Sequence, residues 1–173
     1  MFSIHACSLP DGALLGAYGR EGVYTDCYTT DISGAVSPAQ YVTAFYTTWV
    51  FKLERLILKW AVSRPSTDTD AELLAEGTTD SFAAWRIERR GDNQLLMCDF
   101  RGRTRSWFMA APLKSESGAN TRLYFGSAVV PVEHPKTGKA ELGWRFRALL
   151  GFHKMYSRVL LQAARSRLEA RRA

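Results

Sequence analysis

The stretch from Glu141 to Arg172 constrains the fold of this chain more than any other part of the sequence. It contains no proline and one internal glycine, Gly151. Apolar and ring side chains recur in it at steps of three and four: Leu142, Phe146, Leu149, Leu150, His153, Tyr156, Leu160, Ala163, Ala164 and Leu168. This spacing predicts one helix with a single apolar stripe. A helix of roughly 30 residues is about 45 Å long, and it is stable in water only if the rest of the chain covers its stripe.

The positive charge of the chain is concentrated in the same stretch. The formal net charge is +6, and residues 141–173 alone carry eight Lys or Arg against two Asp or Glu. A broad nucleic-acid surface would spread its basic residues more widely, so we expect no nucleic-acid partner. Arginine is a strong helix former and cations suit the end of a helix, so helix formation alone also accounts for this basic face.

Length and composition predict a single domain over residues 1–173. The chain has 173 residues and 46% hydrophobic content, enough for a substantial core. No apolar run approaches the roughly 18 residues of a membrane span, and Met1 to Leu9 lacks the features of a secretory signal. The three cysteines, Cys7, Cys27 and Cys98, are scattered and odd in number, which indicates neither a disulfide framework nor a metal site. We therefore expect a cytoplasmic protein in a reducing compartment.

The first half of the chain predicts one strand and two helices. Residues 1–22 are glycine-punctuated and are expected to form a loosely ordered lead-in, and Val23 to Ile32 is a strand candidate. Ser37, Pro38 and Gln40 have the spacing of an N-cap, a first-turn proline and a capping box. They begin a helix over about 38–62, whose apolar stripe is Val42, Phe45, Trp49, Leu53, Leu56, Ile57 and Trp60.

A second, shorter helix follows the first. Thr69 and Glu72 repeat the capping-box spacing, and Gly77 supplies a stop. The sequence therefore predicts a helix over about 70–76, which makes a helix pair between the first strand and the later ones.

After Gly77 the hydrophobic period changes from 3.6 to 2. Four strands are predicted, over Ser81–Arg90, Gln94–Phe100, Thr104–Leu113 and Thr121–Val132, separated by short turns. Short turns between consecutive strands indicate an antiparallel meander. Strands and helices segregated in this way are typical of the α+β class, and one face of the sheet can cover the terminal helix.

The two turns of the meander set an expected register. A two-residue turn at Asp92-Asn93 and a three-residue turn at Arg101 to Arg103 place one set of side chains on the interior face: Trp85, Ile87, Leu96, Cys98, Phe100, Ser106, Phe108 and Ala110. The same register puts Arg86, Asp99 and Arg105 on the outer face, as a solvated ladder or, alternatively, a binding group. A slip of one residue would exchange the two faces.

The order of elements resembles the helix-grip fold of the START / polyketide-cyclase / Bet v-like superfamily, often called SRPBCC. The end of the chain, LYFGSAVVPV followed by LGWRFRALLGFHKMYSRVLLQAARSRL, is similar to a bacterial branch of that superfamily with no assigned function. Members of this branch carry a Phe-His pair, here Phe152-His153, before a run of basic residues. The early Asp26-Cys27-Tyr28 and the helix from Tyr41 to Trp60 are compatible with it.

The resemblance implies a curved antiparallel sheet that grips the C-terminal helix, with a cavity between them. Such cavities often hold lipids, hormones or polyketides, and a minority of members catalyse cyclisation or hydrolysis. The superfamily commonly has six or seven strands, whereas five are evident here. Two alternatives explain this lower number: a segment predicted as one strand contains two, or the lead-in supplies a further strand.

Seven residues are candidates to line such a cavity: Trp85, Cys98, Phe108, Tyr124, Leu149, His153 and Tyr156. His153 could hydrogen-bond a ligand or act as an acid or base, or it could satisfy a structural partner. Aromatic residues with a polar tip suit an apolar cavity, and Tyr46 and Trp107 could line one as well as Trp85 and Tyr124, although such residues are more often plain core. There is no G-x-S-x-G elbow, no phosphate-binding loop in Gly16 to Gly22 and no metal-ligand spacing, so we expect no cofactor and no metal.

Three functions remain open on these grounds. The first is binding of a hydrophobic small molecule or lipid in the cavity. The second is a cyclase-type or hydrolase-type enzyme that uses His153 with Asp99 or Tyr124. The third is a structural or partner-binding module with a filled core and a basic helix as its contact surface, and a homodimer is compatible with each.

Overall fold

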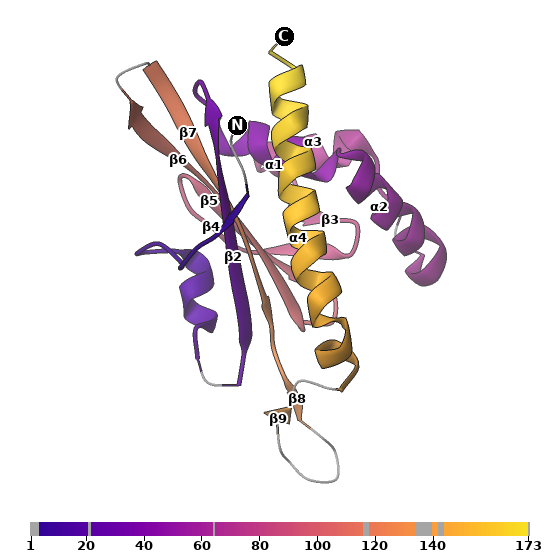
Figure 1. Ribbon diagram of the computed structural model, residues 1–173. Coiled ribbons are helices and arrows are strands. Elements are labelled where there is room, and N and C mark those ends of the chain that lie inside the picture. Colours follow the sequence, from indigo (N-terminus) through magenta and orange to yellow (C-terminus); the bar gives the residue numbers. More distant parts are fainter. Residues whose placement is uncertain are drawn as a thin grey trace.

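The computed structural model describes residues 4–20, 22–63, 65–115, 118–133, 140–141 and 144–172. One curved antiparallel sheet of seven strands, in the order β1-β2-β7-β6-β5-β4-β3, carries its α-helices on one face (Figure 1). The strands are β1 (His5–Ala6), β2 (Tyr24–Ser33), β3 (Ser81–Phe82), β4 (Trp85–Arg90), β5 (Gln94–Asp99), β6 (Thr104–Ser115) and β7 (Gly118–Val129). A separate pair joins β8 (Val132–Glu133) to β9 (Ala140–Glu141).

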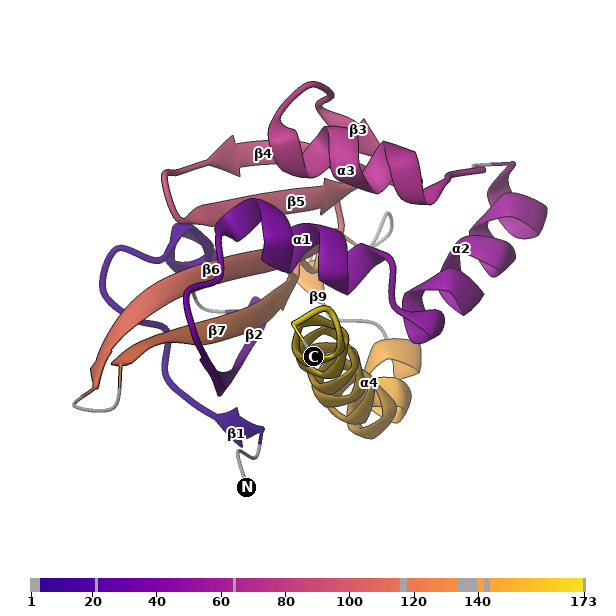
Figure 2. The same ribbon diagram turned by 90° about the horizontal axis from the view of Figure 1, so that it is seen from above.

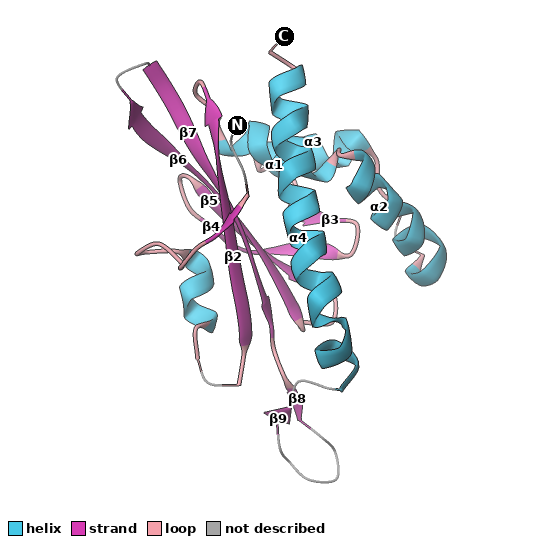
Figure 3. Cartoon of the chain, viewed as in Figure 1, coloured by secondary structure: helices cyan, strands magenta, loops and turns pink. Residues whose placement is uncertain are grey.

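The helices are the short 3-10 helix η1 (Leu14–Tyr18) and four α-helices: α1 (Pro38–Tyr46), α2 (Trp49–Val62), α3 (Asp68–Glu76) and α4 (Trp144–Ala170) (Figure 3). Seen from above, α3, α1 and α4 lie side by side on the sheet, and α2 runs outward from them (Figure 2). The predicted α+β class and the order of strand, helices, meander and long helix are confirmed. Among the described residues, none of the helices is long and apolar enough to cross a membrane.

The sheet has two more strands than the sequence predicted, for two reasons. The segment expected as one strand over 81–90 is a tight hairpin, in which Ala83 adopts a positive φ of 53° and β3 folds back on β4. The lead-in supplies β1, which pairs with β2 through His5 and Ala6. The lead-in is therefore part of the folded body and is not the loose segment that was expected.

The predicted helix over 38–62 is two helices, divided at Thr47 and Thr48. Thr47 Oγ1 donates to the carbonyl of Thr43 at 2.7 Å, and Thr48 Oγ1 donates to the carbonyl of Phe45 at 2.9 Å. Thr48 Oγ1 also accepts from the amide of Phe51 at 3.2 Å, as an N-cap does. Both hydroxyls compete with the helical hydrogen-bond ladder, and the chain changes direction there. The capping box at Ser37 and Gln40 is confirmed, with both of its hydrogen bonds present.

The short helix begins two residues earlier than predicted. Thr67 is its N-cap, and its capping box is closed by Asp70, whose carboxylate accepts from the amide of Thr67 at 2.7 Å. The carboxylate of Asp70 at the third helical position reaches back to the amide of the N-cap, as the glutamate of a capping box does. The predicted pair of Thr69 and Glu72 is therefore not the one that caps this helix. Gly77 ends the helix in the left-handed conformation, φ 82°, as predicted.

The register of β5 differs from the prediction because two irregularities intervene. Beside the first turn the prediction is right, since Arg90 pairs with Leu95, but a bulge between Ile87 and Arg89 shifts the remaining pairs by one residue. The second turn is longer than expected, because Asp99 Oδ1 accepts from the amides of Arg103 and Thr104, at 2.6 and 3.0 Å. In consequence β4 and β6 present the predicted faces, whereas β5 is reversed. The expected ladder of Arg86, Asp99 and Arg105 does not form, and Arg105 pairs with Glu88 at 3.0 Å.

The sheet has an apolar core on each face. The helix side holds the larger cluster, built around aromatic rings such as Phe45, Phe108 and Phe125. The opposite side holds Leu15, Cys27, Leu96, Trp107 and Ala128, and η1 covers it through Leu15. Here Cys7 and Cys27, twenty residues apart, bring their free thiols within 3.2 Å.

Helix α4 packs on β2 and β7 and against α1. Leu160, Leu161, Ala164 and Leu168 are buried in that contact. The covering of this helix, on which the sequence argument depended, is therefore present over its second half. Leu142 and the side chains of Phe146 and Leu149 lie outside the described residues.

Candidate functional site

A cavity of about 150 Å³ lies between the inner face of the sheet and helices α1, α2 and α4. Its walls combine apolar side chains with hydrogen-bonding ones: Phe45, Tyr46, Phe51, Glu54, Trp85, Thr104, Ser106, Phe125, Ser127, His153, Tyr156, Ser157 and Leu160. A cavity of about 150 Å³ is large enough for a molecule the size of benzene. Glu54, Trp85, His153 and Tyr156 are only partly buried, so they form its polar rim.

One side of the cavity carries a cluster of Asp26, Ser127 and His153. The Ser127 hydroxyl donates to Asp26 Oδ1 at 2.6 Å, and the Ser127 amide donates to the same oxygen at 3.0 Å. His153 Nε2 lies 2.8 Å from Ser127 Oγ and 3.6 Å from Asp26 Oδ2. Strands β2 and β7 pair Asp26 directly with Ser127, and α4 adds the imidazole from above.

The hydrogen bonding of this cluster fixes the direction in which protons are shared. A serine hydroxyl has one proton, and that of Ser127 is given to Asp26. Nε2 of His153 therefore carries a proton and donates it to Ser127 Oγ. Burial lowers the pKa of His153, while the Asp26 carboxylate acts in the opposite direction. The imidazole also meets the ring of Tyr24 edge-on, with centroids 5.7 Å apart.

The other side of the cavity carries a carboxyl group held by two aromatic donors. Glu54 of α2 accepts from the hydroxyl of Tyr156 of α4 at 2.5 Å. Desolvation raises the pKa of Glu54, and hydrogen bonds from Tyr156 and Trp85 partly offset this effect. A carboxyl of this kind can exchange a proton nearer to neutral pH than an exposed glutamate.

A third polar group lies in the cavity wall without a partner. Tyr46 of α1 is fully buried, and its hydroxyl oxygen makes no hydrogen bond in the described part of the chain. Burial raises the pKa of this phenol well above its usual range, and the nearby Glu54 acts in the same direction. The hydroxyl therefore keeps its proton and remains an unused donor. Buried polar atoms of this kind are uncommon and call for an explanation.

The predicted cavity residues divide into four groups. Trp85, His153 and Tyr156 line the cavity. Phe108 belongs to the inner core and borders a separate void of about 10 Å³. Cys98 and Tyr124 lie on the opposite face of the sheet, so their prediction as cavity residues was wrong. The side chain of Leu149 lies outside the described residues.

The position of Cys98 follows from the reversed register of β5, where it pairs with Arg105 and Arg86. Tyr124 packs beside Trp107, with ring centroids 6.0 Å apart. Asp99, the other acid considered for catalysis, caps the turn into β6. None of these three side chains lines the cavity.

Sequence reasoning considered Tyr46 as a pocket residue, and it lines the cavity, but it missed Asp26, Glu54 and Ser127. Glu54 gave one usable signal: it is an acidic residue within an otherwise apolar and basic helix. Asp26 and Ser127 are 101 positions apart, and only the pairing of β2 with β7 brings them together. In the part of the chain that the structure describes, no group of three His, Cys, Asp or Glu residues could hold a metal ion.

No protein-family model matches the chain, and neither does any curated protein.

Proposed function

We propose that this chain binds a small, uncharged molecule in the cavity between the sheet and α4, with an apolar body of about one ring and a hydrogen-bond acceptor. The observation that carries the proposal is the buried, unpartnered hydroxyl of Tyr46 in the cavity wall. A ligand acceptor would satisfy this donor and recover the free energy that its desolvation costs.

Size and charge narrow the class of ligand. Pockets for drug-sized molecules span about 300–1,000 Å³, so about 150 Å³ favours a smaller ligand than a lipid or a polyketide. Phe45, Phe51 and Phe125 offer ring faces for an apolar body. Glu54 borders the cavity and Asp26 is bonded to its wall, and no Lys or Arg is among the described lining residues. An anionic ligand would therefore meet like charge.

The test uses phenol as the probe, with benzoate as the anionic counterpart and toluene as the purely apolar one. Titration calorimetry on the full chain should show binding of phenol, weaker binding of toluene and none of benzoate. Native mass spectrometry of protein purified from cells should reveal any retained small molecule. A chain that binds none of the probes and retains no molecule would refute the proposal.

The matched variants are Tyr46→Phe and Tyr41→Phe. Tyr46→Phe should weaken phenol binding by about 3–10-fold while leaving stability unchanged or slightly higher. The Tyr41 hydroxyl donates to the carbonyl of Tyr124 at 3.1 Å, so Tyr41→Phe should cost stability and leave phenol binding unchanged. If Tyr46→Phe costs as much stability as Tyr41→Phe, the Tyr46 hydroxyl has another partner and the proposal loses its support.

A hydrolase-type reaction is a second candidate, favoured by the 2.8 Å contact between Ser127 and His153. Activation of a serine requires the imidazole to accept the hydroxyl proton, whereas here that proton is given to Asp26. This direction of proton sharing makes binding the better-supported function. Membership of the helix-grip superfamily remains part of the proposal, and the long terminal helix across an antiparallel sheet supports it.

A further inference from the structure

Helix α2 exposes a row of large apolar side chains. The exposed fractions are 74% for Trp49, 55% for Leu53, 51% for Leu56 and 78% for Trp60. These positions follow steps of four, three and four, so they form one stripe along the helix. A folded protein rarely leaves such a stripe uncovered unless it is a contact surface.

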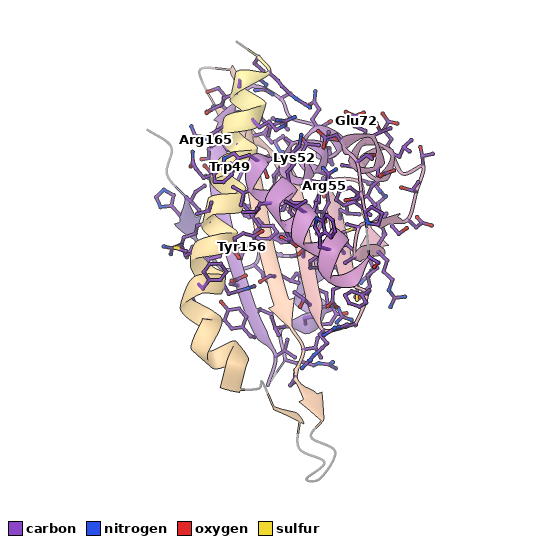
Figure 4. The ribbon with its side chains drawn as sticks, turned by 90° about the vertical axis from the view of Figure 1, so that its right-hand side faces the viewer. Trp49, Lys52, Arg55, Glu72, Tyr156 and Arg165 are labelled. Atoms are coloured by element: carbon purple, nitrogen blue, oxygen red, sulfur yellow. The ribbon has the colours of Figure 1, made fainter. Side chains whose placement is uncertain are left out.

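The stripe continues across a groove onto α4. The groove has a volume of about 670 Å³, and Trp49 and Val50 form one wall while Val159 and Ala163 form the other. Helix α4 exposes Phe152, Met155 and Val159 on its outer surface. Figure 4 shows the start of α2, at Trp49, beside α4. Seven of the eight large exposed apolar residues in the described part of the chain therefore belong to these two helices.

The charge beside this face is positive. Arg158 and Arg167 line the groove, and no carboxylate is among its described lining residues. Within the described part of the chain neither arginine is in an ion pair, and the Nε of Arg167 is buried without a hydrogen-bond partner. Lys154, one turn before Arg158, is exposed. A complementary surface would combine negative charge with apolar groups.

We propose that the outer face of α2 and α4 docks on a bilayer that contains anionic phospholipid. Helix α2 projects from the body as a ridge (Figures 1 and 2), and a ridge with tryptophans at both ends of its apolar stripe suits insertion at the membrane interface. Lipid phosphates would then lie against Arg158 and Arg167. A second copy of the chain would bring the same cations together, and the like charges would repel. This proposal is independent of the small-molecule cavity.

The test is co-sedimentation of the full chain with vesicles of phosphatidylcholine alone and of phosphatidylcholine mixed with phosphatidylglycerol. We expect binding to the mixed vesicles and weaker binding at high salt, because salt screens the arginines. Leu53→Glu should weaken vesicle partitioning roughly tenfold or more. Leu53 is exposed, so the melting temperature should not change.

Phe100→Glu is the matched control, since Phe100 is also exposed but lies at the turn after β5. It should leave vesicle binding unchanged. Arg158→Gln with Arg167→Gln should abolish the preference for phosphatidylglycerol. No binding to either vesicle, or equal binding by the wild type and Leu53→Glu, would overturn the proposal. A dimer in sedimentation velocity that Leu53→Glu dissociates would also overturn it and would identify a second copy as the occupant.

Discussion

The Ser127 hydroxyl lies 2.8 Å from His153 Nε2 while it donates its own proton to Asp26. The imidazole is therefore a donor at Nε2, and it is held by a hydroxyl whose other contact is a carboxylate. Burial lowers the pKa of this histidine, and Asp26 only partly opposes the effect. This combination links the protonation of His153 to the stability of the fold.

We predict that His153 makes the fold less stable as the pH falls below 6.5, the ordinary histidine value. Between that value and the lower pKa in the folded chain, the unfolded chain binds a proton that the folded chain does not. The free energy of unfolding therefore decreases as the pH falls through this window, and the contribution is fully present above it. Urea unfolding at a series of pH values measures how steeply the free energy of unfolding changes with pH. His153→Gln should reduce this slope. Equal slopes in the wild type and in His153→Gln would contradict the prediction.

We predict that Glu54 and Tyr156 are coupled in their contributions to the free energy of unfolding. Tyr156→Phe removes the hydroxyl that donates to Glu54, and it should lower the free energy of unfolding by about 1–2 kcal/mol at neutral pH. It should also raise the pKa of Glu54 further, because one of the hydrogen bonds that stabilise the carboxylate is lost. In a Glu54→Gln background, Tyr156→Phe should lower the free energy of unfolding by a smaller amount. A double-mutant cycle by urea unfolding measures the difference, and additive losses would show that the two groups are not coupled.

Gly126 and Gly151 predict opposite effects of the same substitution. A Cβ on Gly126 would lie 2.8 Å from a methyl of Leu15 and 2.9 Å from the backbone oxygen of Asp26. Gly126→Ala should therefore destabilise the fold by about 1–3 kcal/mol. A Cβ on Gly151 meets no atom within 4 Å, so Gly151→Ala in helix α4 should stabilise by roughly 0.5–1 kcal/mol. Thermal unfolding of both variants measures these changes in stability. If Gly126→Ala is as stable as the wild type, η1 does not pack closely on the sheet at this position.

The Cys7–Cys27 pair predicts a disulfide under oxidising conditions. One molecule of oxidised glutathione should take up the two electrons and two protons of the thiols: its S–S bond breaks, one S–S bond forms between Cys7 and Cys27, and two molecules of reduced glutathione are released. Burial raises the pKa of Cys27, so the reaction should be slow near neutral pH because the thiolate is the reactive form. Mass spectrometry after alkylation should find Cys7 and Cys27 protected and the buried Cys98 not paired with either. Pairing of Cys98 instead would contradict the register of β1 on β2.

The parts of the fold that the sequence predicted are those with a local cause. The capping box at Ser37 and Gln40, the stop at Gly77 and the stripe of α4 each depend on residues within a few positions of one another. The register of β5 could not be predicted in the same way. A bulge after Ile87 and a turn lengthened by the Asp99 side chain each moved the pairing by one residue, and on a strand one residue reverses the face. Cys98 was misplaced for that reason.

The residues of the cavity also divide into those that the sequence revealed and those that only the fold brings together. His153, Tyr156 and Trp85 were found because ring side chains on a helix stripe or an inner strand face are visible in the sequence. Asp26 and Ser127 have ordinary sequence surroundings, and their chemistry arises from contacts across the sheet. Tyr46 was a candidate from the sequence, but its lack of a hydrogen-bond partner follows only from the fold. The strongest stripe of the first half, from Trp49 to Trp60, was placed in one continuous helix with Phe45. The hydroxyls of Thr47 and Thr48 turn it outward instead.

The junction between α1 and α2 limits how the cavity can open. Tyr46 and Glu54 approach the cavity from the two sides of this junction, which has only Thr47 and Thr48 between the helices, both buried and hydrogen-bonded. A rotation of α2 about this junction would disturb these buried hydrogen bonds. Side-chain rotations at the rim disturb fewer contacts, and this route of entry favours compact molecules over long flexible ones.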